Sequence, residues 1–167
     1  MIITNNEEAL RVKCENVSLE EAYDLIQTLE NELNAANKTN NRGIGLAAPQ
    51  IGIAKKAAII RIGDYKVNLI NAIIDKKYDL KTFQDEGCLS FPGRVETTNR
   101  YQEITLINNL LYPHSMILSG LLAVAVQHEL DHTNGTLFFD HAIKTKIRPN
   151  DLCICNSGKK YKKCCLK

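Results

Sequence analysis

Two histidines and a glutamate form the segment of this 167-residue chain best suited to chemistry. His128, Glu129 and His132 follow the spacing His-Glu-x-x-His. On a helix, residues four apart stand about 40° apart in projection and ~6 Å apart along the axis, so both imidazoles can reach one metal ion. The glutamate between them can lie beside a water bound to that ion. With Cys88, from a glycine-containing turn upstream, the pattern predicts a metal with three protein ligands and one open position, which is a catalytic arrangement.

Three blocks of the chain carry a family resemblance. They are Gly43-Ile44-Gly45-Leu46-Ala47-Ala48-Pro49-Gln50, Glu86-Gly87-Cys88-Leu89-Ser90 and Gln127-His128-Glu129-Leu130-Asp131-His132. In this order, they resemble the three signature motifs of the peptide deformylases, and the resemblance covers roughly residues 8–141. It implies a metal-dependent hydrolase that removes the formyl group from the N-terminal formyl-methionine of nascent polypeptides. The fold that it implies is α+β, with antiparallel sheets around a central His-Glu-x-x-His helix.

The resemblance also implies roles for the residues that could act in catalysis. Cys88, His128 and His132 are the implied ligands of one catalytic divalent metal, with Fe(II) as the usual ion, while mixed nitrogen and sulfur ligation also accepts zinc or nickel. Glu129 is the implied general base, which takes a proton from the metal-bound water and delivers it to the leaving amine.

Further residues are implied around the reacting carbonyl and the methionine side chain. The side-chain amide of Gln50 and the backbone N–H of Leu89 are the expected donors of an oxyanion hole. The residues expected to line the substrate pocket are Gly43, Ile44, Gly45, Glu86, Leu121, Val124 and Ala125. Simple core packing explains Leu121 and Val124 equally well. A pair between Arg100 and Asp131 would anchor the ligand helix from behind.

The last residues of the chain carry a second cysteine cluster. Cys153, Cys155, Cys164 and Cys165 lie in a segment that closely resembles the SEC-C zinc module. Four thiolates fit a closed tetrahedral zinc site, and this structural zinc would supply the folding free energy of so short a tail. We therefore expect a catalytic domain at 1–147 and a SEC-C-like module at 148–167, with a disordered basic tail as the alternative.

Charge and composition limit the partners and the compartment. Residues 144–167 hold eight basic residues and one acid, a net +7 that leaves −5 on the rest of the chain, since the whole chain carries +2. A basic tail suggests an anionic partner such as the ribosome or rRNA, although a solubilising terminus is an equal alternative. The N-terminus lacks the pattern of a signal peptide, and no apolar run approaches the ~20 residues of a membrane span. We expect a cytoplasmic monomer that acts on formylated nascent peptides.

The elements that must position these residues can also be read from the sequence. Ser18 to Glu21 is a capping box, and the apolar spacing that follows predicts a helix of about five turns. The Asn-rich stretch 34–42 predicts a loop. The expected strands are 57–62, 66–70, an extension of the same sheet over 71–78, and 103–108. Residues 84–92 are expected to be rich in turns. The ligand helix is expected over 121–132, buried on nearly every face and ended by Asn134-Gly135.

Two other functions compete with deformylation. A metallopeptidase would use the same His-Glu-x-x-His pattern to cleave internal amides, but the cysteine ligand and the two upstream blocks argue against it. A catalytically silent adaptor would use only the tail, yet every residue expected to act is present. The chain departs from the family in lacking a proline-rich opening and a long C-terminal helix, so its mode of ribosome docking is open.

Overall fold

The computed structural model describes residues 1–143, 149–153 and 157–166. The helices of the described residues are α1 (Glu7–Leu10), α2 (Leu19–Asn37) and α3 (Gly120–Thr133), with 3-10 turns η1 (Ala48–Ile51), η2 (Phe138–His141) and η3 (Tyr161–Lys163). The strands are β1 (Gly45–Ala47), β2 (Ala57–Ile62), β3 (Tyr65–Ile70), β4 (Ile73–Gly87), β5 (Val95–Ile107) and β6 (Ser115–Ser119).

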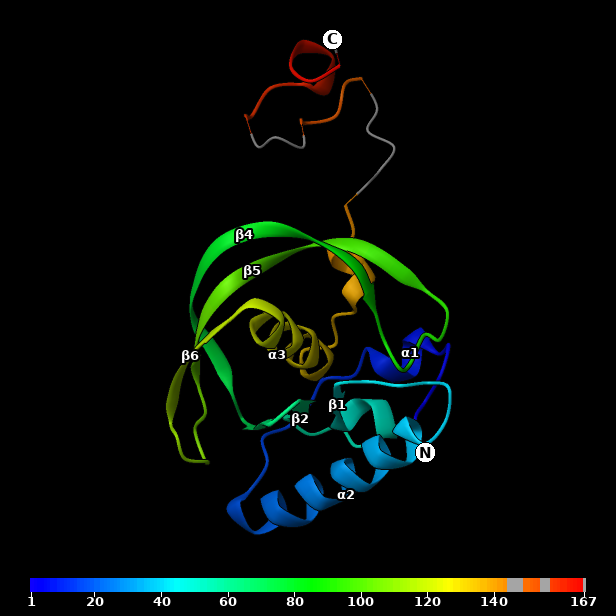
Figure 1. Ribbon diagram of the computed structural model, residues 1–167, viewed down its shortest axis with the longest axis vertical. Coiled ribbons are helices and arrows are strands. Elements are labelled where there is room, and N and C mark those ends of the chain that lie inside the picture. The colour runs from blue at the N-terminus through cyan, green and yellow to red at the C-terminus, as the bar shows by residue number, and fades with distance from the viewer. Residues whose placement is uncertain (144–148, 154–156, 167) are drawn as a thin grey trace.

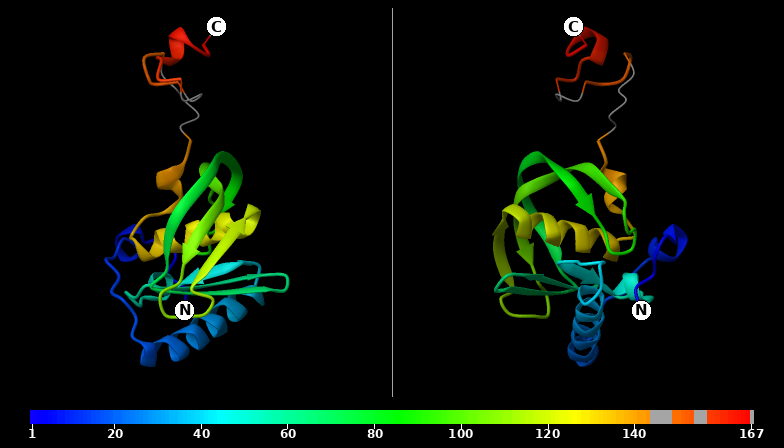
Figure 2. Two further views of the ribbon diagram at one scale, coloured as in Figure 1. Left: turned by 90° about the vertical axis from the view of Figure 1, so that its left-hand side faces the viewer. Right: turned by 45° about the vertical axis from the view of Figure 1, so that its right-hand side comes forward.

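The strands form two antiparallel sheets that enclose α3. One sheet has the order β1-β2-β3 and the other has the order β4-β5-β6. Figures 1 and 2 show the layers: α2 covers one face of the first sheet, and α3 lies between its other face and the arch of β4 and β5. The predicted α+β fold with antiparallel sheets around a central helix is therefore confirmed, and a cysteine cluster is present in the tail.

Strand β2 is apolar on both faces because both faces are covered. Ile59 packs in the cluster that contains Leu29 of α2, whereas the next residue, Ile60, packs in the cluster that contains Val126 of α3. A strand covered on both sides has a continuous apolar run in place of alternation. The predicted strand at 57–62 is confirmed, and β3 begins one residue earlier than expected.

Helix α2 begins where the sequence predicts and ends later. Ser18 accepts a hydrogen bond from the backbone N–H of Glu21, and Glu21 accepts one from that of Ser18, which is the predicted capping box. The predicted loop at 34–42 is wrong for its first four residues, because α2 continues to Asn37. There the Asn37 side chain makes two hydrogen bonds to the backbone of Gly43, so the polar stretch ends the helix against a partner.

The expected extension of the first sheet over 71–78 is wrong. Asn71 has a φ of 51°, and its side chain bonds both the N–H and the C=O of Val17, which turns the chain away from the first sheet. Ile73 then opens β4 in the second sheet. The segment expected to be rich in turns also begins later, because β4 runs to Gly87 through an irregularity between Phe83 and Glu86. The strand expected at 103–108 is part of the longer β5.

Helix α3 is the buried axis of the molecule and carries two of the candidate ligands. Residues 123–130 are all buried, which agrees with the burial predicted for nearly every face of this helix. The helix ends at Thr133, and Gly135 takes a left-handed φ of 70°. That conformation favours glycine, as the sequence predicts for the end of this helix.

Candidate metal centre and active site

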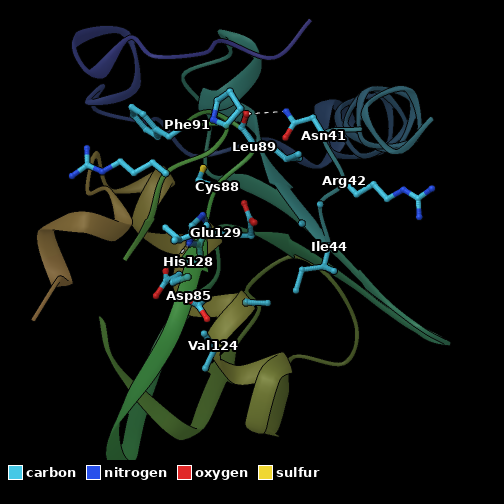
Figure 3. Close-up of a pocket in the computed structure, with 18 of the residues that line it drawn as sticks. Asn41, Arg42, Ile44, Asp85, Cys88, Leu89, Phe91, Val124, His128 and Glu129 are labelled. Carbon is cyan, nitrogen blue, oxygen red and sulfur yellow. Dashed lines mark hydrogen bonds and ion pairs between the residues drawn. The ribbon is translucent and has the colours of Figure 1, made fainter. Parts of the chain in front are cut away.

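Cys88 and the two histidines of α3 meet at the end of β4. Their ligand atoms, one sulfur and two ring nitrogens, all lie within 4.8 Å of one another. The Sγ of Cys88 is 3.3 Å from Nε2 of His132, and the two imidazole rings have centroids 5.1 Å apart. Figure 3 shows Cys88, His128 and Glu129 facing the same pocket. A thiolate and two imidazoles at this spacing are a donor set that suits a divalent transition metal.

A buried ion-pair network holds the ring of His128. Nδ1 of His128 lies 2.7 Å from Oε1 of Glu86, and the same carboxylate accepts two hydrogen bonds from Arg100 and one from Thr98. Arg100 also binds Asp131 at 2.6 Å, so the predicted Arg100–Asp131 pair is confirmed. The bond at Nδ1 leaves Nε2 of His128 as the nitrogen available to a metal.

Electrostatics within the network favour a charged Glu86. Burial alone would raise the pKa of Glu86, but hydrogen bonds from His128 and Arg100 and their positive charge lower it to about 2. For His128, burial would lower the pKa, and the bonds to Cys88 and Glu86 raise it well above its ordinary value. Burial, followed by the charges of His128 and Arg100, lowers the pKa of His132 well below its ordinary value.

Glu129 is a buried carboxylate beside the candidate ligands. Within the described part of the chain, its Oε2 atom has no hydrogen-bond partner. Burial raises the pKa of Glu129 to about 7, although the charge of His128 opposes the shift. Gly45 packs directly on this carboxylate, because a Cβ atom at position 45 would overlap Oε1 of Glu129. A carboxylate so placed can exchange a proton with a group in the pocket.

Gln50 is oriented toward the same point by its neighbours. Its Oε1 accepts the backbone N–H of Ala47 at 2.8 Å, so its Nε2 is directed to Ser90 Oγ at 3.1 Å and to Cys88 Sγ at 3.4 Å. Leu89 follows Cys88 and is buried, with its carbonyl bound to the Asn41 side chain at 3.2 Å. Both expected oxyanion donors therefore lie on segments that are fixed beside Cys88.

A cavity of about 480 Å³ opens over these groups. All seven residues expected to line the substrate pocket border it, together with Gln50, Cys88, Leu89, His128 and Glu129. Glu86 differs from the rest of that set, because its carboxylate is already bound to His128, Arg100 and Thr98. The side chains of Ile44 and Leu121 remain partly exposed in the wall, which leaves apolar surface for a ligand.

Several residues that position the site have no clear sequence signal. Ile3 donates its backbone N–H to Gln50 O at 2.7 Å and Asn5 donates to Ser90 O at 2.8 Å, so the first residues support both site segments. Phe138 packs against the His128 ring with centroids 5.8 Å apart. Ser90 lies inside the second motif block, and its hydroxyl could have been suspected there. The contacts of Ile3, Asn5 and Phe138 depend on the tertiary fold.

In the tail, three of the four predicted cysteines come together. The Sγ atoms of Cys153, Cys164 and Cys165 lie within 4.8 Å of one another, whereas Cys155 lies outside the described residues. The backbone N–H of Cys153 donates to Lys159 O at 2.7 Å, and Leu152 pairs with Lys160, so Cys153 lies beside the residues that lead into η3. Three thiols in this geometry suit a zinc ion better than an isolated disulfide.

Comparisons with known proteins agree with this geometry. A family model described as Polypeptide deformylase matches residues 1–148, and a SEC-C motif model matches residues 150–167. A peptide deformylase of Desulfitobacterium hafniense is 36% identical over 158 residues, which cover 88% of this chain and 97% of that protein. The crystal structure of peptide deformylase from Thermotoga maritima matches with a TM-score of 0.75 and 29% identity, covering 86% of this chain and 97% of that one. A Synechococcus elongatus peptide deformylase in complex with actinonin matches with a TM-score of 0.76 and 33% identity, over 87% of this chain and 79% of that one.

A cysteine–histidine centre with an adjacent buried carboxylate defines a metal-dependent hydrolase. The chain belongs to the peptide deformylase family and removes the N-formyl group from the formyl-methionine of nascent polypeptides. Its tail carries a SEC-C motif. The described residues contain no helix that is both long and apolar enough to cross a membrane.

Proposed function

We propose that Cys88, His128 and His132 hold one catalytic divalent metal and that deformylation takes place beside it. The observation that carries this proposal is the convergence of one sulfur and two ring nitrogens within 4.8 Å, next to a buried carboxylate oxygen that has no partner in the described part of the chain. Fe(II) is the proposed physiological ion, and zinc or nickel would also be accepted because the ligands are of borderline softness. Metal analysis after anaerobic purification, followed by activity of the reconstituted Fe(II), Zn and Ni forms, tests the choice of metal.

The roles of the chain's own groups follow from their positions. A bound divalent ion supplies Lewis acidity and lowers the pKa of a water in the pocket. Glu129 accepts the proton of the attacking water at a carboxylate oxygen and later delivers it to the leaving amine. The side-chain amide of Gln50 and the backbone N–H of Leu89 donate hydrogen bonds to the oxyanion that develops on the formyl group. Glu86 holds His128 in place from behind, a role that differs from the substrate contact expected at first.

The apolar part of the cavity is the proposed site of the methionine side chain. Ile44 borders it from the segment just before β1, and Leu121, Val124 and Ala125 border it from α3. An unbranched thioether adapts well to such a wall. Because the Synechococcus elongatus relative binds actinonin, we propose that actinonin occupies this cavity as well. Inhibition kinetics with actinonin and formyl-Met-Ala-Ser test whether the two compounds compete for this cavity. Non-competitive inhibition would contradict a shared site.

The experiment that tests the function compares two substrates and one variant. Formyl-Met-Ala-Ser should release formate, whereas the unformylated peptide should give no cleavage at its internal amides. Glu129→Gln should lower kcat by about 10²–10⁴ while it keeps the metal, because only proton transfer is lost. Peptide-bond cleavage by the wild type would favour the metallopeptidase alternative. Full activity of Glu129→Gln would remove Glu129 from the proposed mechanism.

The tail is proposed to be a separate module at 148–167, next to a catalytic domain at 1–147. In it, Cys153, Cys155, Cys164 and Cys165 would bind a structural zinc, which is supported by the three described sulfurs within 4.8 Å. Lys159, Lys160, Lys162 and Lys163 are all exposed around this cluster. We propose that this basic surface binds the ribosome through rRNA phosphates, which would make the association sensitive to salt. Co-sedimentation with ribosomes should be lost when residues 149–167 are deleted, and unchanged co-sedimentation would exclude the proposal.

The enzyme is proposed to work as a cytoplasmic monomer. The formylated amino terminus of a nascent chain is accessible there, and the groups proposed to act, including Gln50, Cys88 and Glu129, border the cavity together without a residue from a second copy. Size-exclusion chromatography with light scattering should give a mass near 18.7 kDa, and a dimer would contradict this prediction.

A further inference from the structure

The unpaired edge of β1 determines the direction in which a bound peptide extends away from the active site. Among the described strands, β1 pairs with β2 along one edge, and its other edge has no partner. Gly43, Ile44 and Gly45, at and just before the start of β1, border the cavity. An extended peptide can add to such an edge through its main chain. Its formyl end must lie beside Glu129, which packs against Gly45. Beyond Gly45 in the other direction, Leu46, Ala47 and Ala48 are fully buried, so the peptide has to leave toward Arg42.

This direction sets which residue of the substrate passes Arg42. Extended chains advance about 3.3 Å per residue, and Arg42 lies three residues before Gly45. Three residues of an extended peptide therefore span about 10 Å. A peptide that begins at Glu129 with its formyl group and runs antiparallel to β1 brings its third residue opposite Arg42. Figure 3 shows the Arg42 side chain directed away from Cys88 and Glu129, which suits contact with a distal residue.

The loop that carries Arg42 is fixed on both sides of it. Before Arg42, the Asn41 side chain donates to Leu89 O at 3.2 Å. After it, Gly43 is held by the two hydrogen bonds with Asn37, at 2.8 and 3.1 Å. The backbone of Arg42 is thus held at the rim of the cavity, while its side chain is exposed and forms no ion pair within the described ranges.

The other charges at the rim are either paired or placed elsewhere. The guanidinium of Arg94 lies 3.7 Å from the centre of the Phe139 ring, and its Nε donates to Glu96 at 3.0 Å, so its charge is largely satisfied. Asp85 borders the cavity from β4, and Figure 3 shows it near Val124 and His128, across the pocket from Arg42. Arg42 is consequently the cation that a passing peptide would meet at its third residue.

We propose that Arg42 selects for an acidic side chain at the third residue of the formylated peptide. This specificity rests on the deformylase site proposed above. An exposed ion pair contributes modestly, so the expected preference for aspartate over lysine at this residue is about threefold to tenfold in kcat/KM. The preference acts on binding, far from the reacting bond, and is therefore expected mainly in KM.

Two formylated tripeptides test this, formyl-Met-Ala-Asp and formyl-Met-Ala-Lys, with formyl-Met-Ala-Ser as the neutral reference. The ratio of kcat/KM for the acidic and basic peptides is compared within each variant, so a general loss of activity cancels. Arg42→Ala should bring the ratio to about 1, Arg42→Glu should invert it, and Arg42→Lys should keep its direction. Raising salt from about 50 to about 500 mM should reduce the wild-type ratio.

Two matched controls separate this contact from general electrostatics. Lys13→Ala removes one exposed positive charge that borders a different cavity, and Asp85→Asn removes the negative charge across the pocket. Both should leave the acidic preference in place. A wild-type ratio of about 1, or a ratio that survives Arg42→Glu, would overturn the proposal. Release of formate from the neutral peptide would still establish deformylation, so the two hypotheses fail separately.

Discussion

At the scale of single residues, Gly45 has almost no freedom to change. A Cβ atom at this position would overlap the Glu129 carboxylate, so Gly45→Ala must displace either the loop or the proposed base. We expect kcat to fall by at least about tenfold, since small displacements of a positioned catalytic group are costly. Steady-state kinetics measure the fall, and circular dichroism checks the fold.

Gly87→Ala is the matched control for this prediction. A Cβ at Gly87 would lie 3.7 Å from its nearest neighbours, which is ordinary contact. The loss of kcat should therefore be smaller for Gly87→Ala than for Gly45→Ala. Equal losses in the two variants would mean that the overlap with Glu129 is unimportant.

Glu86 offers a second prediction at this scale, on metal retention. Its carboxylate holds Nδ1 of His128 and neutralises Arg100 in a buried network. Glu86→Gln removes that negative charge and leaves Arg100 paired with Asp131 alone. We expect the affinity for the catalytic metal to weaken by about 10- to 100-fold, as measured with a competing chelator. Unchanged metal affinity would show that the network does not support the ligand.

The candidate ligands can be predicted from the sequence because they are close together or lie in short motif blocks. His128 and His132 lie four residues apart on one helix, and this spacing alone predicts that both rings reach the same point. The residues that support the site cannot be predicted in this way, because they lie outside the motif blocks in the sequence. Ile3, Asn5 and Phe138 reach the site only through tertiary contacts, and nothing in their neighbouring residues indicates a partner at Gln50, Ser90 or His128.

At the scale of the elements, an exposed ion pair between Arg11 and Asp140 connects η2 to the end of α1. Arg11 donates to both oxygens of Asp140 at 2.7 and 2.8 Å, and Asp140 also accepts the backbone N–H of Leu137. The bond to Arg11, with smaller help from Leu137, lowers the pKa of Asp140 below its ordinary value of 3.8. Because the pKa is lowered in the folded state, the carboxylate stabilises the fold at pH values above its ordinary pKa. This contribution is lost as the pH falls through the folded-state pKa.

Asp140→Asn should therefore change the pH dependence of stability in one direction. The wild type should have the higher Tm, by a constant margin between about pH 7 and pH 5, and the margin should shrink below about pH 4. The pair is partly exposed, so the margin should be small and should decrease with salt. Thermal unfolding of both proteins across this range measures it. A margin that grows on acidification would contradict the assigned direction.

The elements also differ in how well their sequence reveals them. β2 and α3 are covered on both faces, so their apolar runs are long and were predicted nearly to the residue. β4 is exposed along most of its length and rich in charged residues, which leaves no apolar period to detect. It is a strand because it pairs with β5 over nearly its whole length, and such long-range pairing is invisible to local patterns.

At the scale of the whole molecule, the chain combines a large body with a tail of very different character. In the body, α3 lies between two sheets, as Figure 2 shows. Which sheet each strand would join could not be read from the sequence, since the turn at Asn71 depends on its contact with Val17. The tail has so few apolar residues that it cannot form a core of its own, and the proposed zinc would supply its order.

This contrast predicts that the two proposed metals behave independently. The full chain should contain two metals, and a chain that lacks residues 149–167 should contain one, as counted by elemental analysis. Deformylation of a short free peptide should be retained after the deletion, because the described residues that border the cavity all lie between Asn41 and Glu129. Cys153→Ala with Cys164→Ala in the full chain is the matched variant, since it removes the tail metal without shortening the protein. If either change also removed the catalytic metal, the tail would have to be part of the active site.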